Sequence, residues 1–364
     1  MAVAVETRTI DQLPEMVDGL SGDEAQLFHG PNKILEVRAH TGELDLGGLP
    51  FDGLDKQLLI EPYNPWNHNR VVFNRERARR LPEPGDLSQL RLAIASTLHR
   101  NQFCNYQQRT PQNRFNDQGR IEGRYNVTTA SLYMSAQTHG ILIFDHDPLA
   151  IPSEAIFFDR YEVADQWHEA AEVRSPEAVH HSIVENKLKK AGGTVDHGHA
   201  QMAARPGRHE GDMEEYLDNA DWYYVKTGGR NYFDDLYRAH QIVGLDIEVG
   251  SGIQAFASLT PKKEAEVVVF ADRFDLPTRR FLYKLYGYFM DRVSPAFNLM
   301  IGFRPPSYNG RDWGKVPGVV ISIVSRGDPT HENSDIGGFE MMGTKIISTD
   351  PNRIKQELTE VLAA

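Results

Sequence analysis

The alternation of hydrophobic and polar positions along the 364-residue chain predicts many short strands and fewer, longer helices. The predicted strands lie at residues 70–73, 140–144, 181–185, 197–201, 241–249, 252–258, 265–271, 297–303, 318–324 and 344–348. Helices are predicted at residues 90–98, 154–172 and 277–292, and a C-terminal helix begins at residue 351. Strands that follow one another through short connections favour an α+β fold with mainly antiparallel sheets.

Stretches of different character divide the chain. Residues 1–58 are polar, glycine-rich and weakly periodic, so we expect an N-terminal extension that packs on the body or is partly disordered. Pro206-Gly207 and the acidic run at 210–215 predict a linker. The elements on either side of this linker look like variations on one plan, which gives a half-domain at 59–206 and a second one at 207–364.

Composition and charge narrow the class of partner. The formal net charge is −12, so the surface as a whole should repel nucleic acid. No apolar run approaches the roughly 20 residues that cross a bilayer, and the N-terminus lacks a secretory pattern. The single cysteine, Cys104, excludes an internal disulfide and is typical of a reducing compartment. We expect a cytoplasmic protein that binds neither membranes nor nucleic acid.

The most informative motif is His197-Gly-His199-Ala-Gln201. If this segment is extended, alternate side chains share one face, so both imidazoles and the carboxamide point the same way. The preceding run from Asn186 to Thr194 offers small residues and backbone N–H groups, which suit a phosphate. The two pieces together predict a nucleophilic histidine aimed at phosphorus; the alternative is a strand with two hydrogen-bonded structural histidines.

The run Asn186-Lys187-(x)4-Gly192-Gly193-Thr194-(x)2-His197-x-His199-x-Gln201 resembles galactose-1-phosphate uridylyltransferase and its relatives in the histidine-triad superfamily. Weaker matches are Asn64-Pro65 with the arginine-rich block at 77–80, Cys104-Asn-Tyr-Gln107 where relatives have Cys-x-x-Cys, and the glycine–phenylalanine–glutamate segment at 337–340. The resemblance covers roughly residues 60–364. It implies two tandem histidine-triad-like half-domains, each a mainly antiparallel sheet with packed helices.

The resemblance also assigns roles to single residues. It implies nucleotidyl transfer by double displacement, with His199 as nucleophile, Gln201 donating to a phosphate oxygen and His197 more structural. The expected substrate and phosphate contacts are Asn186, Gly192, Gly193, Thr194, Arg77, Arg80, Asn126 and Glu340. The arginines would clamp phosphate and Glu340 would hold sugar hydroxyls, although the arginine block also fits a surface run after a strand. Leu188 stands where many relatives have glycine.

A metal site is left open by the same comparison. Relatives that bind structural zinc use two cysteines and two histidines, and Cys104, His146 and His197 match three of these positions. Gln107 replaces the second cysteine, and an amide oxygen is a poor zinc ligand beside a thiolate. The sequence therefore allows one structural zinc or a vestigial site, and the chemistry at His199 requires no metal.

The predicted activity is transfer of a nucleoside monophosphate between a nucleotide sugar and a sugar 1-phosphate. The alternative is a phosphorylase that splits dinucleoside polyphosphates or nucleotide sugars with inorganic phosphate, and His199 would act in the same way. A non-catalytic nucleotide-binding module is disfavoured by the intact histidine and glutamine, and a hydrolase is disfavoured by Gln201, which can serve as neither acid nor base. Because relatives dimerise, we expect a homodimer.

Overall fold

The computed structural model describes residues 8–49, 51, 53–80, 85–98, 100–114, 119–144, 147–250, 252–306, 310–331 and 333–363. The α-helices are α1 (Leu13–Asp18), α2 (Gly22–His29), α3 (Leu87–Leu98), α4 (Tyr106–Arg109), α5 (Glu154–Arg174), α6 (Gly211–Thr227), α7 (Tyr232–Ile242), α8 (Leu276–Tyr288), α9 (Gly338–Met341) and α10 (Pro351–Ala363). Short 3-10 or π turns are η1 (Ile10–Gln12), η2 (Arg75–Arg80), η3 (Lys189–Ala191), η4 (Phe289–Val293) and η5 (Trp313–Lys315).

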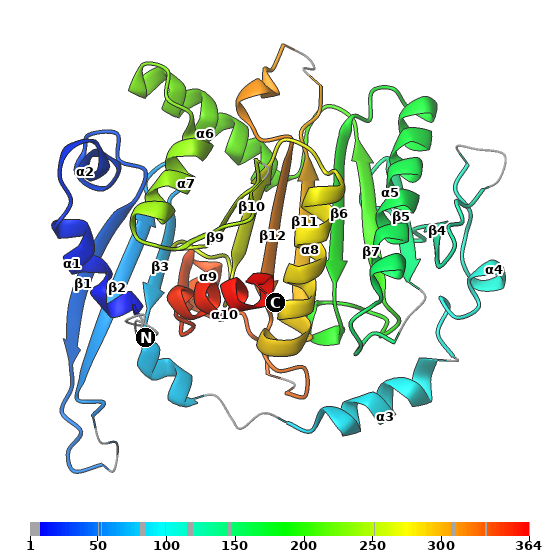
Figure 1. The fold of residues 1–364 in the computed structure, drawn as a ribbon. Helices are drawn as coiled ribbons and strands as arrows, with labels where there is room; N and C mark the ends of the chain where they lie inside the picture. The colour runs from blue at the N-terminus through cyan, green and yellow to red at the C-terminus, as the bar shows by residue number, and fades with distance from the viewer. Residues whose placement is uncertain are drawn as a thin grey trace.

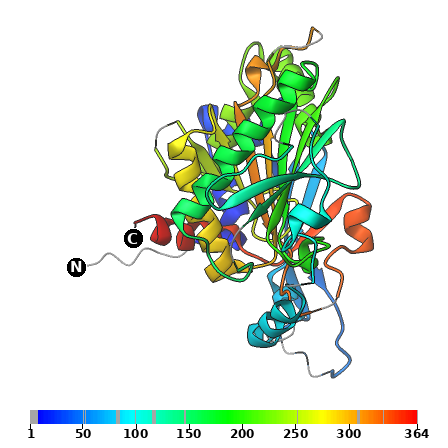
Figure 2. The same cartoon turned by 90° about the vertical axis from the view of Figure 1, so that its right-hand side faces the viewer.

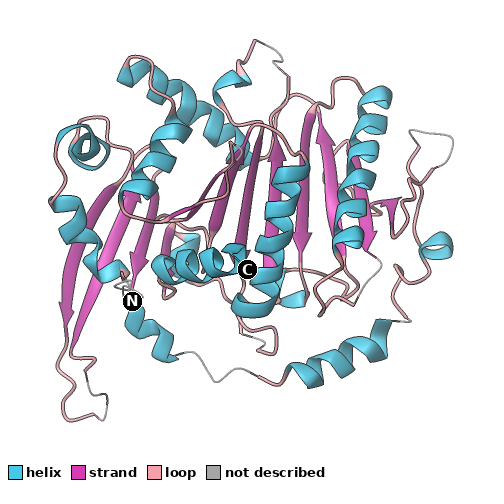
Figure 3. Ribbon diagram, viewed as in Figure 1, coloured by secondary structure: helices cyan, strands magenta, loops and turns pink. Residues whose placement is uncertain are grey.

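The strands are β1 (Glu36–Glu43), β2 (Lys56–Asn64), β3 (Asn69–Phe73), β4 (Asn126–Ala130), β5 (Thr138–Phe144), β6 (His180–Asn186), β7 (His199–Arg205), β8 (Asp246–Ile247), β9 (Gln254–Ala257), β10 (Val267–Ala271), β11 (Phe297–Phe303), β12 (Val319–Ser325) and β13 (Thr344–Ile347). They form a nine-stranded sheet and a four-stranded sheet (Figure 3). The large sheet is antiparallel throughout, which confirms the predicted α+β class.

The large sheet repeats one topology. Its strand order is β4-β5-β7-β6 in the first half and β11-β12-β10-β9, followed by β8, in the second. Each half thus places its third and fourth strands in reversed order, and each carries a helix between its second and third strands, α5 and α8. The halves join where β6 pairs with β11. The predicted pair of similar half-domains is therefore present as two halves of one continuous sheet.

One face of this sheet is covered by helices. The α5, α8 and α10 helices lie in front of it in Figure 1 and on one side of it in Figure 2, with α9 on the other side. Side chains such as Trp167 and Leu285 are fully buried between these helices and the sheet, in the main hydrophobic core. Gly140 is required there because a Cβ atom would lie 2.5 Å from the Trp167 ring.

The opposite face is covered unevenly. In the second half, α6, α7 and the N-terminal elements pack on it and form a second core with residues such as Phe233 and Phe270. In the first half, the segment at 100–110 contributes Phe103 to a small cluster with Val127, Ile141 and Ile143. The HxHxQ segment belongs to this less covered half.

The N-terminal segment packs on the body. Ile10, Leu27 and Ile34 are buried in the second core, and β1 pairs with β2, which crosses residue 58. The C-terminal strand β13 joins the same sheet in parallel with β3. None of the helices in the described parts of the chain is both long and apolar enough to cross a membrane.

Two sequence predictions in the middle of the chain were wrong. The acidic run predicted as part of a linker begins α6, because Asp212 and Glu214 stabilise the positive end of that helix. Residues 241–249 were predicted as a strand, but α7 extends to Ile242 and only the two-residue strand β8 follows. Burial of Leu236 and Ala239 in the second core stabilises α7. The helix therefore continues to Ile242, although the residues from 241 onward have a high strand propensity.

Candidate active site

Alternate side chains of β7 lie on opposite faces of the large sheet. Ala200 and Met202 pack into the main core, while His199 and Gln201 lie on the opposite face. His197 precedes the strand, which begins at His199. The expectation of one extended segment with three aligned side chains is therefore wrong for His197. Its carbonyl oxygen accepts from His199, and its ring bonds the carbonyl oxygen of Phe144.

His199 is held as a neutral imidazole. Its Nδ1 lies 2.9 Å from the carbonyl oxygen of His197, so Nδ1 carries the proton and Nε2 keeps its lone pair. Burial lowers the pKa of His199, because the charged form loses solvation in a site where the side chain is 8% exposed. The Phe103 ring lies 4.9 Å from the imidazole, centroid to centroid, and limits its movement. Such a nitrogen can act as a nucleophile near neutral pH.

Gln201 has a partner that sequence reasoning missed. The Nε2 of His139, on β5, lies 3.1 Å from the Oε1 of Gln201. The backbone N–H of Ser135 donates to the Nδ1 of His139 over 3.0 Å. In the register of the two strands His139 lies diagonally from Gln201 on the same face. His139 precedes the strand predicted at 140–144 and carries no spacing signal, so only the strand pairing reveals the contact.

The loop between β6 and β7 folds through an unusual backbone. Leu188 has φ 67° and ψ 167°, a region that glycine adopts without cost. Its carbonyl oxygen accepts the N–H groups of Ala191 at 3.2 Å and Gly193 at 3.0 Å, which closes the turn. At Gly193 a Cβ atom would lie 2.8 Å from the carbonyl oxygens of Asn186 and Leu188, so the tight loop requires glycine there. Thr194, at the exposed end of this loop, precedes the motif.

Asn186 ends β6 and is bound by the second half of the protein. The Nδ2 of Asn298, on β11, donates to the Oδ1 of Asn186 and to the carbonyl oxygen of Ala191, both at 2.8 Å. Arg326, just after β12, donates to the Oδ1 of Asn298 over 2.7 Å. Asn298 and Arg326 of the second half thus hold the loop between β6 and β7 in place.

Glu340 lies at the far end of the same polar network. Lys263 pairs with Glu340 at 2.8 Å and also contacts Asp335. Asp335 in turn binds the guanidinium of Arg326 through two hydrogen bonds, of 2.5 Å and 2.8 Å. The second carboxylate oxygen of Glu340 accepts the backbone N–H of Gly337 at 2.8 Å. Both oxygens of Glu340 are therefore already engaged.

The structure places two of the three remaining predicted contacts. Arg77 is half-buried in η2, and the side chain of Arg80 lies outside the described residues. The side-chain amide of Asn126 donates to Asp159 at 2.6 Å and to the carbonyl oxygen of Ile156 at 3.0 Å, which ties β4 to α5. Asn126 is buried, with 2% of its surface exposed, and its side-chain amide is engaged by α5.

Two of the predicted metal ligands meet. The Sγ of Cys104 lies 3.3 Å from the Nδ1 of His197, and the Nε2 of His197 bonds the carbonyl oxygen of Phe144 at 3.0 Å. A ring nitrogen fixed on a carbonyl while the other faces a thiol is the usual orientation of a metal-binding histidine. The third predicted ligand, His146, lies outside the described residues. Within the described part of the chain, no group of three such ligands could hold a metal ion.

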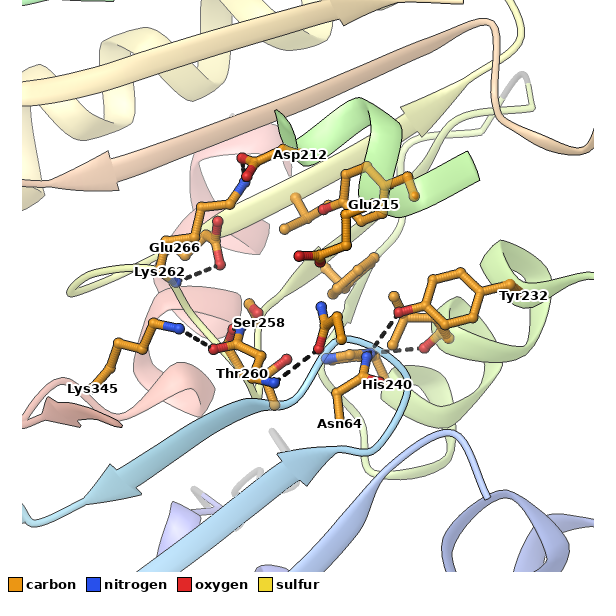
Figure 4. A pocket seen from close by; sticks show the side chains of 16 residues that line it. Asn64, Asp212, Glu215, Tyr232, His240, Ser258, Thr260, Lys262, Glu266 and Lys345 are labelled. Carbon is orange, nitrogen blue, oxygen red and sulfur yellow. Dashed lines mark hydrogen bonds and ion pairs between the residues drawn. The ribbon is translucent and has the colours of Figure 1, made fainter. Parts of the chain in front are cut away.

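A polar cavity of about 190 Å³ lies on the second half, between β9, β10 and the small sheet (Figure 4). Its charged lining comprises Lys262, Lys345, Asp212, Glu215 and Glu266. Lys262 pairs with Asp212 at 2.9 Å, and Glu266 accepts the hydroxyl of Ser322 at 2.5 Å. Because carboxylates outnumber ammonium groups, this cavity does not favour an anion, and none of the predicted site residues lines it.

Comparison with solved structures identifies the architecture. An ADP-glucose phosphorylase from Arabidopsis thaliana with bound ADP-glucose superposes with a TM-score of 0.56 at 16% identity, covering 82% of this chain and 98% of that one. A uridylyltransferase superposes with a TM-score of 0.53 at 14% identity, covering 66% and 86%. The chain has the uridylyltransferase fold. No protein-family model and no curated protein sequence matches it.

The uridylyltransferase fold accounts for the layout of the site. It brings the HxHxQ strand of the first half and the strands β11 and β12 of the second half onto one sheet. The face that carries His199 is thereby continuous with the face that carries Asn298, since β6 and β11 are neighbours. Side chains from both halves therefore lie on one face of the sheet around His199.

Proposed function

We propose that this protein is a nucleotidyltransferase that moves a nucleoside monophosphate from a nucleotide sugar to a phosphorylated acceptor through a nucleotidyl-histidine. In the first step the lone pair of His199 Nε2 forms a P–N bond to the α-phosphorus. The bond from that phosphorus to the bridging oxygen breaks, and the sugar 1-phosphate leaves with the electron pair. In the second step an acceptor phosphate oxygen attacks the same phosphorus, and the P–N bond breaks.

The observation that carries this proposal is the state of His199. Its Nδ1 proton is bound to the carbonyl oxygen of His197, so Nε2 holds a lone pair, and no described residue occupies that nitrogen. As Nε2 forms the P–N bond, the ring becomes cationic and its Nδ1–H bond to the carbonyl strengthens. Gln201 lies on the same face and supports the proposal as a donor to phosphate oxygen.

The preferred acceptor in this proposal is a sugar 1-phosphate, and the second candidate is inorganic phosphate. One observation favours the second candidate. Both carboxylate oxygens of Glu340 are engaged, by Lys263 and by the Gly337 N–H, so sugar hydroxyls would compete with existing partners. The likeness in fold to the ADP-glucose phosphorylase extends over 82% of this chain and is consistent with either acceptor.

Discharge of the adduct distinguishes the two acceptors. Protein labelled by a radioactive nucleotide sugar is freed of donor and then offered galactose 1-phosphate, glucose 1-phosphate or inorganic phosphate. Transfer of label to a sugar phosphate supports the transferase, and transfer only to inorganic phosphate supports the phosphorylase. Rapid loss of the label to water in buffer alone contradicts both, because Gln201 offers no acid or base for water attack.

We also propose one structural zinc on Cys104, His146 and His197, with no metal required in the chemical step. The contact between Cys104 and His197 supports this site. Elemental analysis tests it: about one zinc per chain in the wild type and much less in Cys104→Ser is the expected result, and absence of stoichiometric metal in the wild type contradicts it. We further propose that the protein is cytoplasmic and forms a homodimer. Light scattering of the purified chain tests the dimer.

A further inference from the structure

The orientation of the Gln201 carboxamide follows from one group that can only donate. The backbone N–H of Ser135 points at the Nδ1 of His139 over 3.0 Å, so this nitrogen must be the acceptor. The ring proton of a neutral His139 is then on Nε2, which faces Gln201 at 3.1 Å. The atom of Gln201 that meets an N–H must be its oxygen. The amide NH2 of Gln201 therefore points away from His139, and no described residue accepts from it.

Burial keeps this arrangement in place. His139 is 4% exposed, and burial lowers the pKa of His139. The hydrogen bonds to Gln201 and to the Tyr133 backbone and the charge of Glu210 act in the opposite direction, but the pKa of His139 remains below its ordinary value. A cationic ring would carry a proton on Nδ1 and would clash with the Ser135 N–H. The Ser135 segment is itself held by Arg205, which donates to the Ser135 carbonyl oxygen and pairs with Glu210 at 2.8 Å.

A second, independent chain of hydrogen bonds orients Asn186. We call each such chain, from a group that can only donate to a carboxamide, a relay. A guanidinium can only donate, so the atom of Asn298 that Arg326 meets at 2.7 Å must be oxygen. The Nδ2 of Asn298 then donates to Asn186, whose facing atom must also be oxygen. The NH2 of Asn186 is left without an acceptor among the described residues. Arg326 is fixed by its two hydrogen bonds to Asp335.

Both relays act on one face of the sheet. Val184 pairs with Gln201, so two residues further along β6 Asn186 lies opposite His199 on the same face. Asn298 pairs with Asn186 in the neighbouring strand β11. The NH2 groups of Gln201 and Asn186, for which no described residue is an acceptor, thus flank the nucleophile, one on its own strand and one on the next.

We propose that His139 and Asn298 are positioning residues that hold the carboxamides of Gln201 and Asn186 with their NH2 groups toward the phosphate attacked by His199. This inference rests on the proposed function for the identity of the anion. Without these partners a carboxamide can turn its oxygen toward the phosphate oxygens, where it repels the charge that the site must stabilise. Preorganised donors avoid that loss at the moment of reaction. Through Asn298 the second half of the protein orients a donor to the phosphate.

A tautomer measurement tests the first relay without any substrate. In protein labelled with 15N-histidine, NMR reports which ring nitrogen carries the proton, and the His139→Gln variant assigns the signal. The expected result is a neutral His139 with the proton on Nε2 at pH 7. A proton on Nδ1, or a cationic ring, overturns the inference whether or not the protein is an enzyme.

A matched pair of variants tests the consequence for reaction. In His139→Gln a side-chain NH2 replaces the Nε2–H donor, and in His139→Leu no donor remains. Single-turnover formation of the adduct is followed with radiolabelled ADP-glucose and UDP-glucose. His139→Leu is expected to be slower than His139→Gln by about ten- to a hundredfold, the value of one charge-assisted hydrogen bond. In the Gln201→Ala background the two variants should react equally.

Asn298→Asp tests the second relay in the same assay. The new carboxylate can still pair with Arg326 but cannot donate to Asn186, so a comparable loss is expected. Equal rates for His139→Leu and His139→Gln, together with an unchanged rate for Asn298→Asp, overturn the inference. If the wild type forms no adduct with any donor, the proposed function fails instead, and the tautomer result still decides the relay.

Discussion

Leu188 offers a test of the backbone conformation of the loop between β6 and β7. At this position we expect a glycine variant to be more stable than an alanine variant, which is the reverse of the usual order. Leu188 has φ 67° and ψ 167°, where a side chain costs about 1–3 kcal/mol. It is nevertheless buried, 5% exposed, against Ile94 and Ala296. Leu188→Ala and Leu188→Gly both lose this packing, at about 2–5 kcal/mol. Only the glycine variant also relieves the backbone.

The difference between the two variants isolates the strain. Glycine costs about 0.4–1 kcal/mol relative to alanine through the freedom of the unfolded chain, and it recovers about 1–3 kcal/mol of backbone strain. We therefore expect Leu188→Gly to be more stable than Leu188→Ala by about 0.5–2 kcal/mol. At ordinary positions alanine is the more stable of the two.

Urea denaturation measures this difference directly. A slope of about 3 kcal/mol per molar urea or more is expected for a chain of 364 residues, so a 1 kcal/mol difference moves the midpoint by about 0.3 M or less. Leu282, fully buried within α8, is the matched control, and there alanine should exceed glycine by about 1 kcal/mol. If Leu188→Ala is as stable as Leu188→Gly, the loop does not have the backbone described above.

Three further predictions concern the loop and the histidines. Gly193→Ala forces a Cβ atom to 2.8 Å from the carbonyl oxygens of Asn186 and Leu188, so adduct formation in a quench-flow assay should slow by about tenfold or more. Since burial lowers the pKa of His199, the rate of adduct formation should be flat from pH 7 to 8 and fall only in acid; a rate that rises steadily to pH 8 argues against a neutral resting ring. Burial lowers the pKa of His240 to about 4, so the unfolded chain takes up a proton first as pH falls, and the unfolding free energy should drop by about 2 kcal/mol from pH 7 to 5 through this residue. His240→Gln should reduce the total drop by about 2 kcal/mol in urea titrations at the two pH values, while buried histidines such as His181 and His209 keep their own contributions.

The predictable parts of the fold are those in which local pattern and tertiary packing agree. The strands at 297–303 and 344–348 were predicted within a residue or so. Alternate residues of the first strand are buried, and the second buries Ile347. The α6 helix was missed because its first turn is acidic and exposed, which resembles a linker when its partners in the second core are unknown. The N-terminal segment was read as an extension, since its weak periodicity gains meaning only when β1 pairs with β2.

The candidate site divides in a similar way. His199 and Gln201 could be predicted, because their spacing on one strand is itself the signal. His139 and Asn298 could not, because their roles depend on which strands are neighbours and on hydrogen bonds across 62 and 112 positions of the chain.

The identity of the nucleophile is the central claim, and one measurement tests it most directly. Wild-type protein and His199→Ala are incubated with radiolabelled ADP-glucose and UDP-glucose, digested in mild alkali, and the labelled peptide is sequenced by mass spectrometry. The account predicts an acid-labile, base-stable nucleotidyl group on His199 in the wild type and none in the variant. A label on another residue, or a label that persists in His199→Ala, contradicts it.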